Sequence, residues 1–312
     1  MKNLKVIFMG TPFFSVPILE KLIEQTNVVL VVSMPDAVVG RKKILTASPV
    51  KKLAIENDIP VFSPKKIRDD YKIIEGLKPD IIITCAYGQI LPKVLLDFPR
   101  LGCINIHASL LPKYRGGAPI HHAIMNGDAE TGITIMDMDE KMDAGDIIKQ
   151  KSLKINIGDN LETLSNKLSL LGRDIIIEVL PSIINGTNKR VKQKLAKVTY
   201  APIIKRENEL LDFHKSADEV YNLVRALSPS PYAYFNLFNS QYKIVSCEVT
   251  LGKGLPGVII SVAKDSFTIM CKDKGIKITK IKPTGKNEMT VKDFFNGFDK
   301  EKLLGKEVNN EE

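Results

Sequence analysis

The sequence predicts an α/β fold, in which an open and mostly parallel sheet is followed by a small β-barrel. The first strand is expected over Lys5–Met9, because this apolar run leads through Gly10-Thr11-Pro12 into residues with helical spacing of their apolar positions. Strand, tight turn and helix form the first half of a βαβ unit. The mainly β-branched runs Val28–Val32 and Ile81–Thr84 are typical of parallel strands that are covered on both faces.

The same alternation of strands and helices continues to about residue 150. Ser48 is suited to cap a helix, and Asp159 is a candidate cap for a long helix that reaches Ile184. After residue 206 a short helix, Ser216–Leu227, precedes a series of short strands separated by turn residues, which predicts a barrel. These strands are expected over Val245–Thr250, Gly257–Val262, Phe267–Cys271 and Ile276–Ile281.

The length of the chain predicts two domains. Its 312 residues exceed the roughly 250 that one core usually serves. Hydrophobic residues at 44% and charged residues at 26% are close to globular averages, which excludes global disorder. We expect a first domain over residues 1–186, a basic linker over 187–205 and a C-terminal barrel domain over 206–312.

The cysteines and the apolar runs indicate where the protein acts. Cys85, Cys103, Cys247 and Cys271 form no CxxC pair, which argues against a zinc site and against structural disulfides. The N-terminal apolar stretch is broken by Gly10 and Pro12 and is too short for a secretory signal. No run approaches the ~18 residues of a membrane span. We therefore expect a cytoplasmic protein.

The net charge of +9 is concentrated in one segment. Residues 187–205 contain six basic side chains and no acidic one, so most of the excess lies there. Either a polyanion lies across this segment, or the segment is a solvated linker that self-repulsion keeps extended.

Residues 104–146 carry the most informative group of polar side chains. Asn105 and His107 are two apart on an expected strand and therefore share a face, and Asp143 follows in a glycine-bearing loop. Transfer of an acyl group to an amine needs a donor to the carbonyl oxygen, a proton carrier and a carboxylate that balances the carrier's charge. Taken singly, a core histidine, a turn-capping asparagine and an aspartate in an Asx-turn explain the same residues.

The combination SLLPKYRGGAPI (109–120) and TGITIMDMDEKMDAGD (131–146), with Asn105 and His107 before it, resembles the 10-formyltetrahydrofolate-dependent formyltransferases. Further matches favour the members of that family that act on methionyl initiator tRNA: VIFMGTPFFSVPILEKL (6–22), PDAVVGRKK (35–43), CAYGQILP (85–92), TYAPIIKRE (199–207) and VRALSPSP (224–231). The resemblance implies a Rossmann-like catalytic domain and an OB-like barrel that assists tRNA binding.

The resemblance also implies roles for single residues. It makes Asn105, His107 and Asp143 the catalytic amide, imidazole and carboxylate. Folate contacts are implied for Ser109, Leu110, Leu111 and Pro112. We expect tRNA contacts from the loop Arg41, Lys42 and Lys43 and from Lys189, Arg190, Lys192 and Lys194 of the basic segment.

The expected reaction moves the formyl group of 10-formyltetrahydrofolate to the α-amino group of methionyl initiator tRNA, without a metal and with the protein as a monomer. Lys141 departs from the family pattern, which usually has glycine there. Two alternatives stay open at this point. One is a formyltransferase for a small amine, such as a sugar nucleotide or glycinamide ribonucleotide, and the other is a non-catalytic RNA-binding protein.

Overall fold

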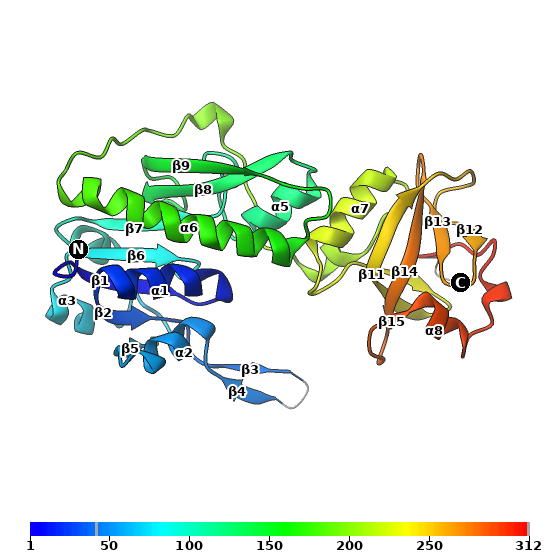
Figure 1. Ribbon diagram of the computed structural model, residues 1–312, viewed down its shortest axis with the longest axis horizontal. Helices are drawn as coiled ribbons and strands as arrows, with labels where there is room; N and C mark the ends of the chain where they lie inside the picture. Colours follow the sequence, from blue (N-terminus) through cyan, green and yellow to red (C-terminus); the bar gives the residue numbers. More distant parts are fainter. Residues whose placement is uncertain (41–42, 311–312) are drawn as a thin grey trace. The chain divides into compact units, whose positions relative to one another are not determined.

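The computed structural model describes residues 1–40 and 43–310 (Figure 1). The chain forms two compact units. The first comprises residues 1–119, 130–154 and 165–201, and the second comprises 120–129, 155–164 and 202–312. The boundaries that the sequence suggested, at residues 186 and 205, remain a prediction.

The first unit contains a seven-stranded sheet in the order β5-β2-β1-β6-β7-β8-β9. Five strands are parallel: β5 (Val61–Phe62), β2 (Asn27–Val32), β1 (Lys5–Gly10), β6 (Ile81–Cys85) and β7 (Cys103–His107). β8 (Glu130–Asp137) and β9 (Ile147–Lys154) are added antiparallel at one edge. The predicted open, mostly parallel sheet is confirmed.

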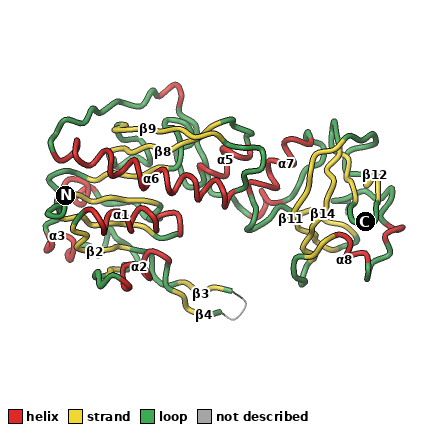
Figure 2. Tube along the Cα trace, viewed as in Figure 1, coloured by secondary structure: helices red, strands yellow, loops and turns green. Residues whose placement is uncertain are grey.

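Side chains that alternate along the strands divide the core between the two faces of this sheet. Figure 2 draws the strands of the sheet in yellow and the helices in red. Ile7 and Met9 of β1 belong to a cluster that also contains Cys103 of β7. On the opposite face lie α1 (Val16–Gln25) and the long helix α6 (Leu161–Ile184). A side chain at Gly172 of α6 would come within 3.2–3.3 Å of Ile18 and Ile106, so α6 packs closely on α1 and β7.

Short helices and a hairpin occupy the connections of this unit. They are η1 (Phe13–Ser15), β3 (Ala37–Val39), β4 (Ile44–Thr46), α2 (Pro49–Glu56), α3 (Lys72–Leu77), α4 (Lys93–Asp97) and η2 (Leu195–Lys197). Helix α5 (Pro119–Met125) belongs to the second unit from Ile120 on. Ser48 caps α2 as predicted, since its hydroxyl accepts a hydrogen bond from the Lys51 amide at 3.1 Å. For α6 the predicted cap was wrong: Asn160, rather than Asp159, accepts the bond from the Thr163 amide at 2.9 Å.

Residues 187–201 of the expected linker are packed onto the first unit. Val191 and Ile147 exchange two backbone hydrogen bonds of 2.8 and 2.9 Å, which adds a short rung beside β9. Further along, the Arg115 amide donates to the carbonyl of Thr199 at 2.9 Å. The segment is therefore held along its length by the sheet edge and by the loop after β7.

The second unit has a six-stranded antiparallel sheet with the main order β10-β11-β14-β13-β12 and with β15 on β14. Its elements are η3 (Arg206–Glu209), α7 (Ala217–Ala226), β10 (Tyr234–Leu237), β11 (Ser240–Thr250), β12 (Ile259–Val262), β13 (Phe267–Met270), β14 (Gly275–Pro283), β15 (Met289–Thr290), α8 (Val291–Phe295) and η4 (Lys300–Lys302). Ser216 caps the predicted helix, since its hydroxyl accepts from the Glu219 amide and the Glu219 carboxylate accepts from the Ser216 amide. The predicted short strands are confirmed.

The curled sheet of this unit is completed by the C-terminal segment. Glu307 bridges to Val258 beside β12, and Asn309 bonds with Asn236 of β10 through its amide and its side chain. The core within the curl is aromatic, with Phe235 fully buried between Tyr242, at a centroid distance of 5.6 Å, and Phe267, at 6.2 Å. No helix in residues 1–40 and 43–310 is both long enough and apolar enough to cross a membrane.

Candidate active site

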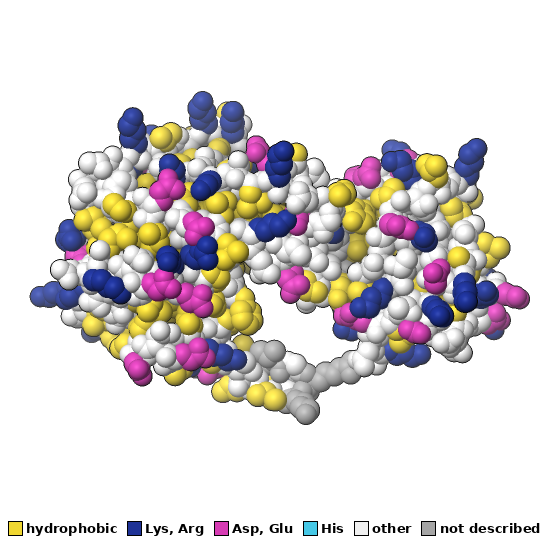
Figure 3. All heavy atoms as spheres, in the orientation of Figure 1, with side chains coloured by type: hydrophobic (Ala, Val, Ile, Leu, Met, Phe, Trp, Pro, Cys, Tyr) yellow, Lys and Arg dark blue, Asp and Glu magenta, His cyan; other side chains and the backbone are white. Residues whose placement is uncertain are grey.

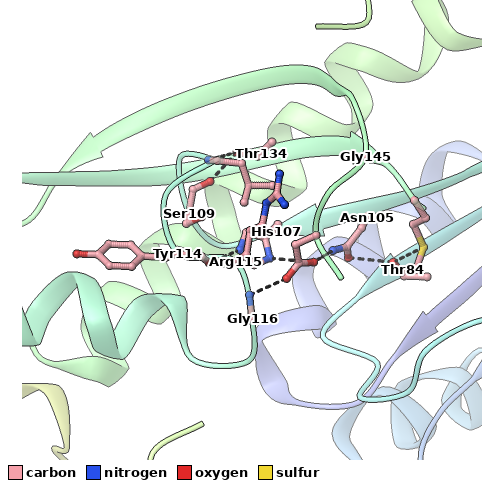
Figure 4. Close-up of polar contacts among 12 residues, drawn as sticks. Thr84, Asn105, His107, Ser109, Tyr114, Arg115, Gly116, Thr134 and Gly145 are labelled. Carbon is pink, nitrogen blue, oxygen red and sulfur yellow. Dashed lines mark hydrogen bonds and ion pairs between the residues drawn. The ribbon is translucent and has the colours of Figure 1, made fainter. Parts of the chain in front are cut away.

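β7 presents Asn105 and His107 on one face of the sheet, at its carboxyl end. They share this face with Cys103, on the side opposite to α6, because side chains two apart on a strand point the same way. Thr84 of the neighbouring strand β6 pairs with Asn105, and its hydroxyl donates to Asn105 Oδ1 at 2.9 Å (Figure 4). This bond fixes the amide oxygen, so the Asn105 Nδ2 group is directed away from Thr84.

The environment of His107 determines which ring nitrogen can take a proton. Its side chain is only 6% exposed, and Nε2 lies 2.9 Å from the carbonyl oxygen of Tyr114. Because a carbonyl oxygen only accepts, Nε2 carries the hydrogen and donates. Nδ1 is then the nitrogen with a free electron pair, and it lies 3.6 Å from Asp143 Oδ1.

Asp143 lies at the centre of the group. Its Oδ1 is 3.6 Å from His107 Nδ1 and 3.4 Å from Asn105 Nδ2, and its Oδ2 accepts a bond from the Gly116 amide at 2.8 Å. The backbone of Asp143 is left-handed, with φ of 50°, whereas Lys141 adopts no such conformation. The structure thus brings the three predicted side chains together, while their catalytic roles remain a prediction.

The loop that follows β7 is held by internal hydrogen bonds. The Ser109 hydroxyl donates to the Lys113 carbonyl at 2.6 Å, and the Thr134 hydroxyl donates to the Ser109 carbonyl at 2.6 Å. Ser109 and Leu111 are buried, whereas Leu110 and Pro112 are partly exposed. The predicted folate contacts stay a prediction, and only these last two side chains offer surface for them.

A hollow of about 310 Å³ adjoins the Asp143 loop within the first unit. It is lined by Lys93, Leu96, Asp97, Asp137, Met138, Asp139, Glu140, Gly145 and Asp146. The lining is rich in carboxylates, which accept hydrogen bonds but cannot donate them when ionised. Within the described part of the chain, no cluster of three or more His, Cys, Asp or Glu side chains is placed to hold a metal ion.

The thiol on the same strand as Asn105 and His107 is not suited to nucleophilic chemistry. Cys103 shares the face of β7 with Asn105 and His107. Burial raises the pKa of the Cys103 thiol to about 12, with a smaller contribution from Asp97. Because the thiolate is the nucleophile, this thiol is inert near neutral pH.

The predicted RNA-binding side chains differ in their surroundings. Lys189, Lys192 and Lys194 are exposed, and Figure 3 shows Lys and Arg side chains projecting along the edge where Figure 1 draws this segment. Arg190 instead forms an ion pair with Asp137 at 2.5 Å. Lys43 is exposed, while Arg41 and Lys42 lie outside the described residues.

Two supporting residues could not have been singled out from the sequence. Thr84 lies in an apolar strand, and Gln193 lies in the basic segment, yet both bond to the predicted catalytic group or its loop. The guanidinium of Arg115 donates two hydrogen bonds to Oε1 of Gln193. No local pattern marks a glutamine that bonds across 50 residues of sequence.

Comparison with known proteins identifies the chain. The family model described as formyl transferase matches residues 2–180, and that of the formyl transferase C-terminal domain matches residues 203–299. The chain therefore belongs to the formyltransferase family, and within it to the group of the methionyl-tRNA formyltransferases. It is 47% identical to the methionyl-tRNA formyltransferase of Staphylococcus epidermidis over 306 residues, which covers 97% of this chain and 98% of that protein.

Other relatives agree with this assignment. The methionyl-tRNA formyltransferase of Macrococcus caseolyticus is 46% identical over 98% of this chain and 99% of its own length. Among solved structures, the N-formyltransferase of Helicobacter canadensis, crystallised with folinic acid and dTDP-3-aminofucose, has a TM-score of 0.67. That match covers 88% of this chain and 98% of the other at 22% identity, so it supports the fold alone.

Proposed function

We propose that this protein transfers the formyl group of 10-formyltetrahydrofolate to the α-amino group of methionyl initiator tRNA. The observation that carries the proposal is the convergence of Asn105, His107 and Asp143 within 3.4–3.6 Å at the carboxyl end of a parallel strand. Ligands of open α/β sheets bind at such ends. The close relatives that are named methionyl-tRNA formyltransferases support the choice of donor and acceptor.

The geometry suggests how each side chain acts. The methionyl amine attacks the formyl carbon, and the oxyanion that forms accepts a hydrogen bond from Asn105 Nδ2, which Thr84 orients. His107 Nδ1 takes a proton from the attacking nitrogen and returns one to N10 of the folate as the old C–N bond breaks. The Asp143 carboxylate stabilises the imidazolium in between.

His107 does not need to be a strong base in this scheme. An α-amino group has an ordinary pKa of about 7.7–8.0, so a fraction of it is already neutral near pH 7. The task of the imidazole is to carry the proton that the nitrogen loses as it becomes an amide. A metal ion has no step assigned to it.

The hollow beside the Asp143 loop is the proposed place for the heterocycle of the folate. The amino and ring N–H groups of a pterin are donors, and the hollow offers acceptors such as Asp139 and Asp146. The partly exposed Leu110 and Pro112 are available to contact the apolar remainder of the folate.

For the RNA, we infer that Lys189, Lys192 and Lys194 contact phosphates together with the loop Arg41, Lys42 and Lys43. Exposed lysines without a described carboxylate partner are suited to this role, whereas Arg190 has to exchange Asp137 for a phosphate. The barrel unit is proposed to assist. We further infer that the protein acts as a monomer in the cytoplasm, where translation takes place, and light scattering after gel filtration tests the monomer.

An acceptor panel tests the proposal. Purified protein and 10-formyltetrahydrofolate are offered methionyl initiator tRNA, methionyl elongator tRNA, glycinamide ribonucleotide and an amino-sugar nucleotide in separate reactions. Only the initiator tRNA is expected to gain the formyl mass efficiently. Preferential formylation of a small amine would replace the proposed acceptor, and no transfer to any of them would remove the enzyme assignment.

A further inference from the structure

Gln193 lies in the basic segment but is buried, and both ends of its side chain are bonded. Its Nε2 donates to the backbone carbonyls of Asp143 and Gly145, each at 2.8 Å. Its Oε1 accepts from Nε and Nη2 of Arg115 at 3.0 and 2.8 Å. With 9% of its surface exposed, Gln193 joins two loops that are otherwise separate in sequence.

These bonds close a ring around Asp143. The backbone carbonyl of Asp143 is held by Gln193, Gln193 is held by Arg115, and the amide of the next residue, Gly116, donates to the Asp143 carboxylate at 2.8 Å. Asp143 is thus fixed through both its main chain and its side chain. The tether also helps to hold Asp143 at its left-handed φ of 50°, a conformation that costs energy for a residue other than glycine.

The same segment also supports the partner of His107. Thr199 Oγ1 accepts a hydrogen bond from the Tyr114 amide at 2.9 Å, and the Tyr114 carbonyl faces His107 Nε2. On either side of Gln193, Lys192 and Lys194 point their charged side chains to the surface. The segment from Lys192 to Thr199 therefore exposes cations to solvent, and other side chains in it support Asp143 and His107.

We propose that Gln193 is a positioning residue, which sets the Asp143 carboxylate against His107 by tying the Asp143 loop to Arg115. The catalytic part of this inference rests on the proposed function, whereas the tether between the Asp143 loop and Arg115 can be tested without it. Gln193 touches neither reactant in this account and acts only through Asp143.

Gln193→Glu is the informative substitution, because it keeps the acceptor for Arg115 and removes both donors to the loop. Gln193→Met is the second variant, since it removes both polar ends without adding a charge and serves if the first variant does not fold. The matched control is Gln241→Glu in the barrel unit, where the amide oxygen likewise accepts from an arginine, Arg206 Nη2, at 2.7 Å.

Hydrogen exchange tests the tether without any activity. Amides of residues 141–146 are expected to exchange about tenfold faster in Gln193→Glu or Gln193→Met than in the parent protein, and to be unchanged in Gln241→Glu. Parent-like exchange in both Gln193 variants would overturn the inference. Because hydrogen exchange needs no substrate, it tests the tether even if no acceptor in the panel is formylated.

Kinetics then test whether the tether acts through Asp143. In the parent protein, Gln193→Glu is expected to lower kcat about tenfold with little change in either KM. In the Asp143→Asn protein, the same substitution is expected to lower kcat by less than about twofold. A merely structural role would lower kcat by the same factor in both backgrounds, and that result would reject the positioning role.

Discussion

Replacing Asp143 by asparagine tests the electrostatic part of the mechanism. Asparagine has the same shape and can still accept the hydrogen bond from the Gly116 amide. It removes the negative charge that faces His107 Nδ1 at 3.6 Å. The expected consequence is that the imidazolium formed during proton transfer is no longer stabilised.

The size of the effect follows from that distance. Two unit charges 3.6 Å apart attract by about 4–5 kcal/mol at an effective dielectric constant of about 20. Part of this lost attraction is offset, because a neutral asparagine is less costly to desolvate than a carboxylate and the Asp143 side chain is only 14% exposed. We therefore expect a net loss of about 3 kcal/mol, which is about a hundredfold in kcat.

The assay is formyl transfer at saturating folate and tRNA, with KM determined for each substrate. Asp143→Asn should reduce kcat about a hundredfold and leave both KM values within about threefold. Asp174→Asn is the control, because its carboxylate is exposed and pairs with Arg173 on α6. A kcat within about threefold of the parent would refute the charge-balancing role of Asp143.

Four further predictions concern other parts of the molecule. Asn105→Ala should lower kcat by about a hundredfold to a thousandfold in steady-state kinetics while folate KM changes little, and an unchanged kcat would remove the oxyanion role. Burial, with help from His122, lowers the pKa of His121 from 6.5 to about 4. The folded state therefore binds fewer protons than the unfolded state in this window, and stability falls as the pH drops from 6.5 to 4. His121→Leu should reduce this loss of unfolding free energy between pH 6.5 and 4 by about 1–2 kcal/mol in urea titrations, a figure that allows for the partial exposure of the ring. An equally steep pH dependence in the variant would contradict this. Gly116→Ala should destabilise the protein by about 1–3 kcal/mol in thermal unfolding, and a Tm equal to that of the parent would contradict this. The reason is that φ is +120° and the added carbon would lie 2.8 Å from the Ala201 carbonyl oxygen. Replacing Lys192 and Lys194 together by alanine should reduce the salt slope of tRNA binding by about two units, and an unchanged slope would exclude phosphate contacts there.

Much of the fold follows from the sequence because its elements have strong local patterns. The run from Val28 to Val32 became β2, and Ser48 caps α2 through its own hydroxyl, as a local rule requires. The cap of α6 was misassigned because Asp159 and Asn160 are adjacent and equally suited. The Asp159 carboxylate instead accepts from the Asn156 amide in the turn before the helix.

The candidate site could be predicted in part. Asn105 and His107 lie two apart on a strand, so their common face follows from geometry. Asp143 was proposed from the chemistry that acyl transfer needs, and the resemblance supported it. The supports could not be predicted, because Gln193 and Thr84 act through contacts with residues 50 and 21 positions away. The basic segment was interpreted by charge alone, which hid the buried, uncharged side chain of Gln193 within it.

Asn105, His107 and Asp143 are proposed to surround the carbon that is transferred. A crystal structure of the protein with the stable donor analogue 5-formyltetrahydrofolate and methionyl initiator tRNA tests this arrangement most directly. We expect the formyl group within about 4 Å of both Asn105 Nδ2 and His107 Nδ1, with the methionyl nitrogen on the His107 side. A formyl group bound more than about 8 Å from all three side chains would contradict it.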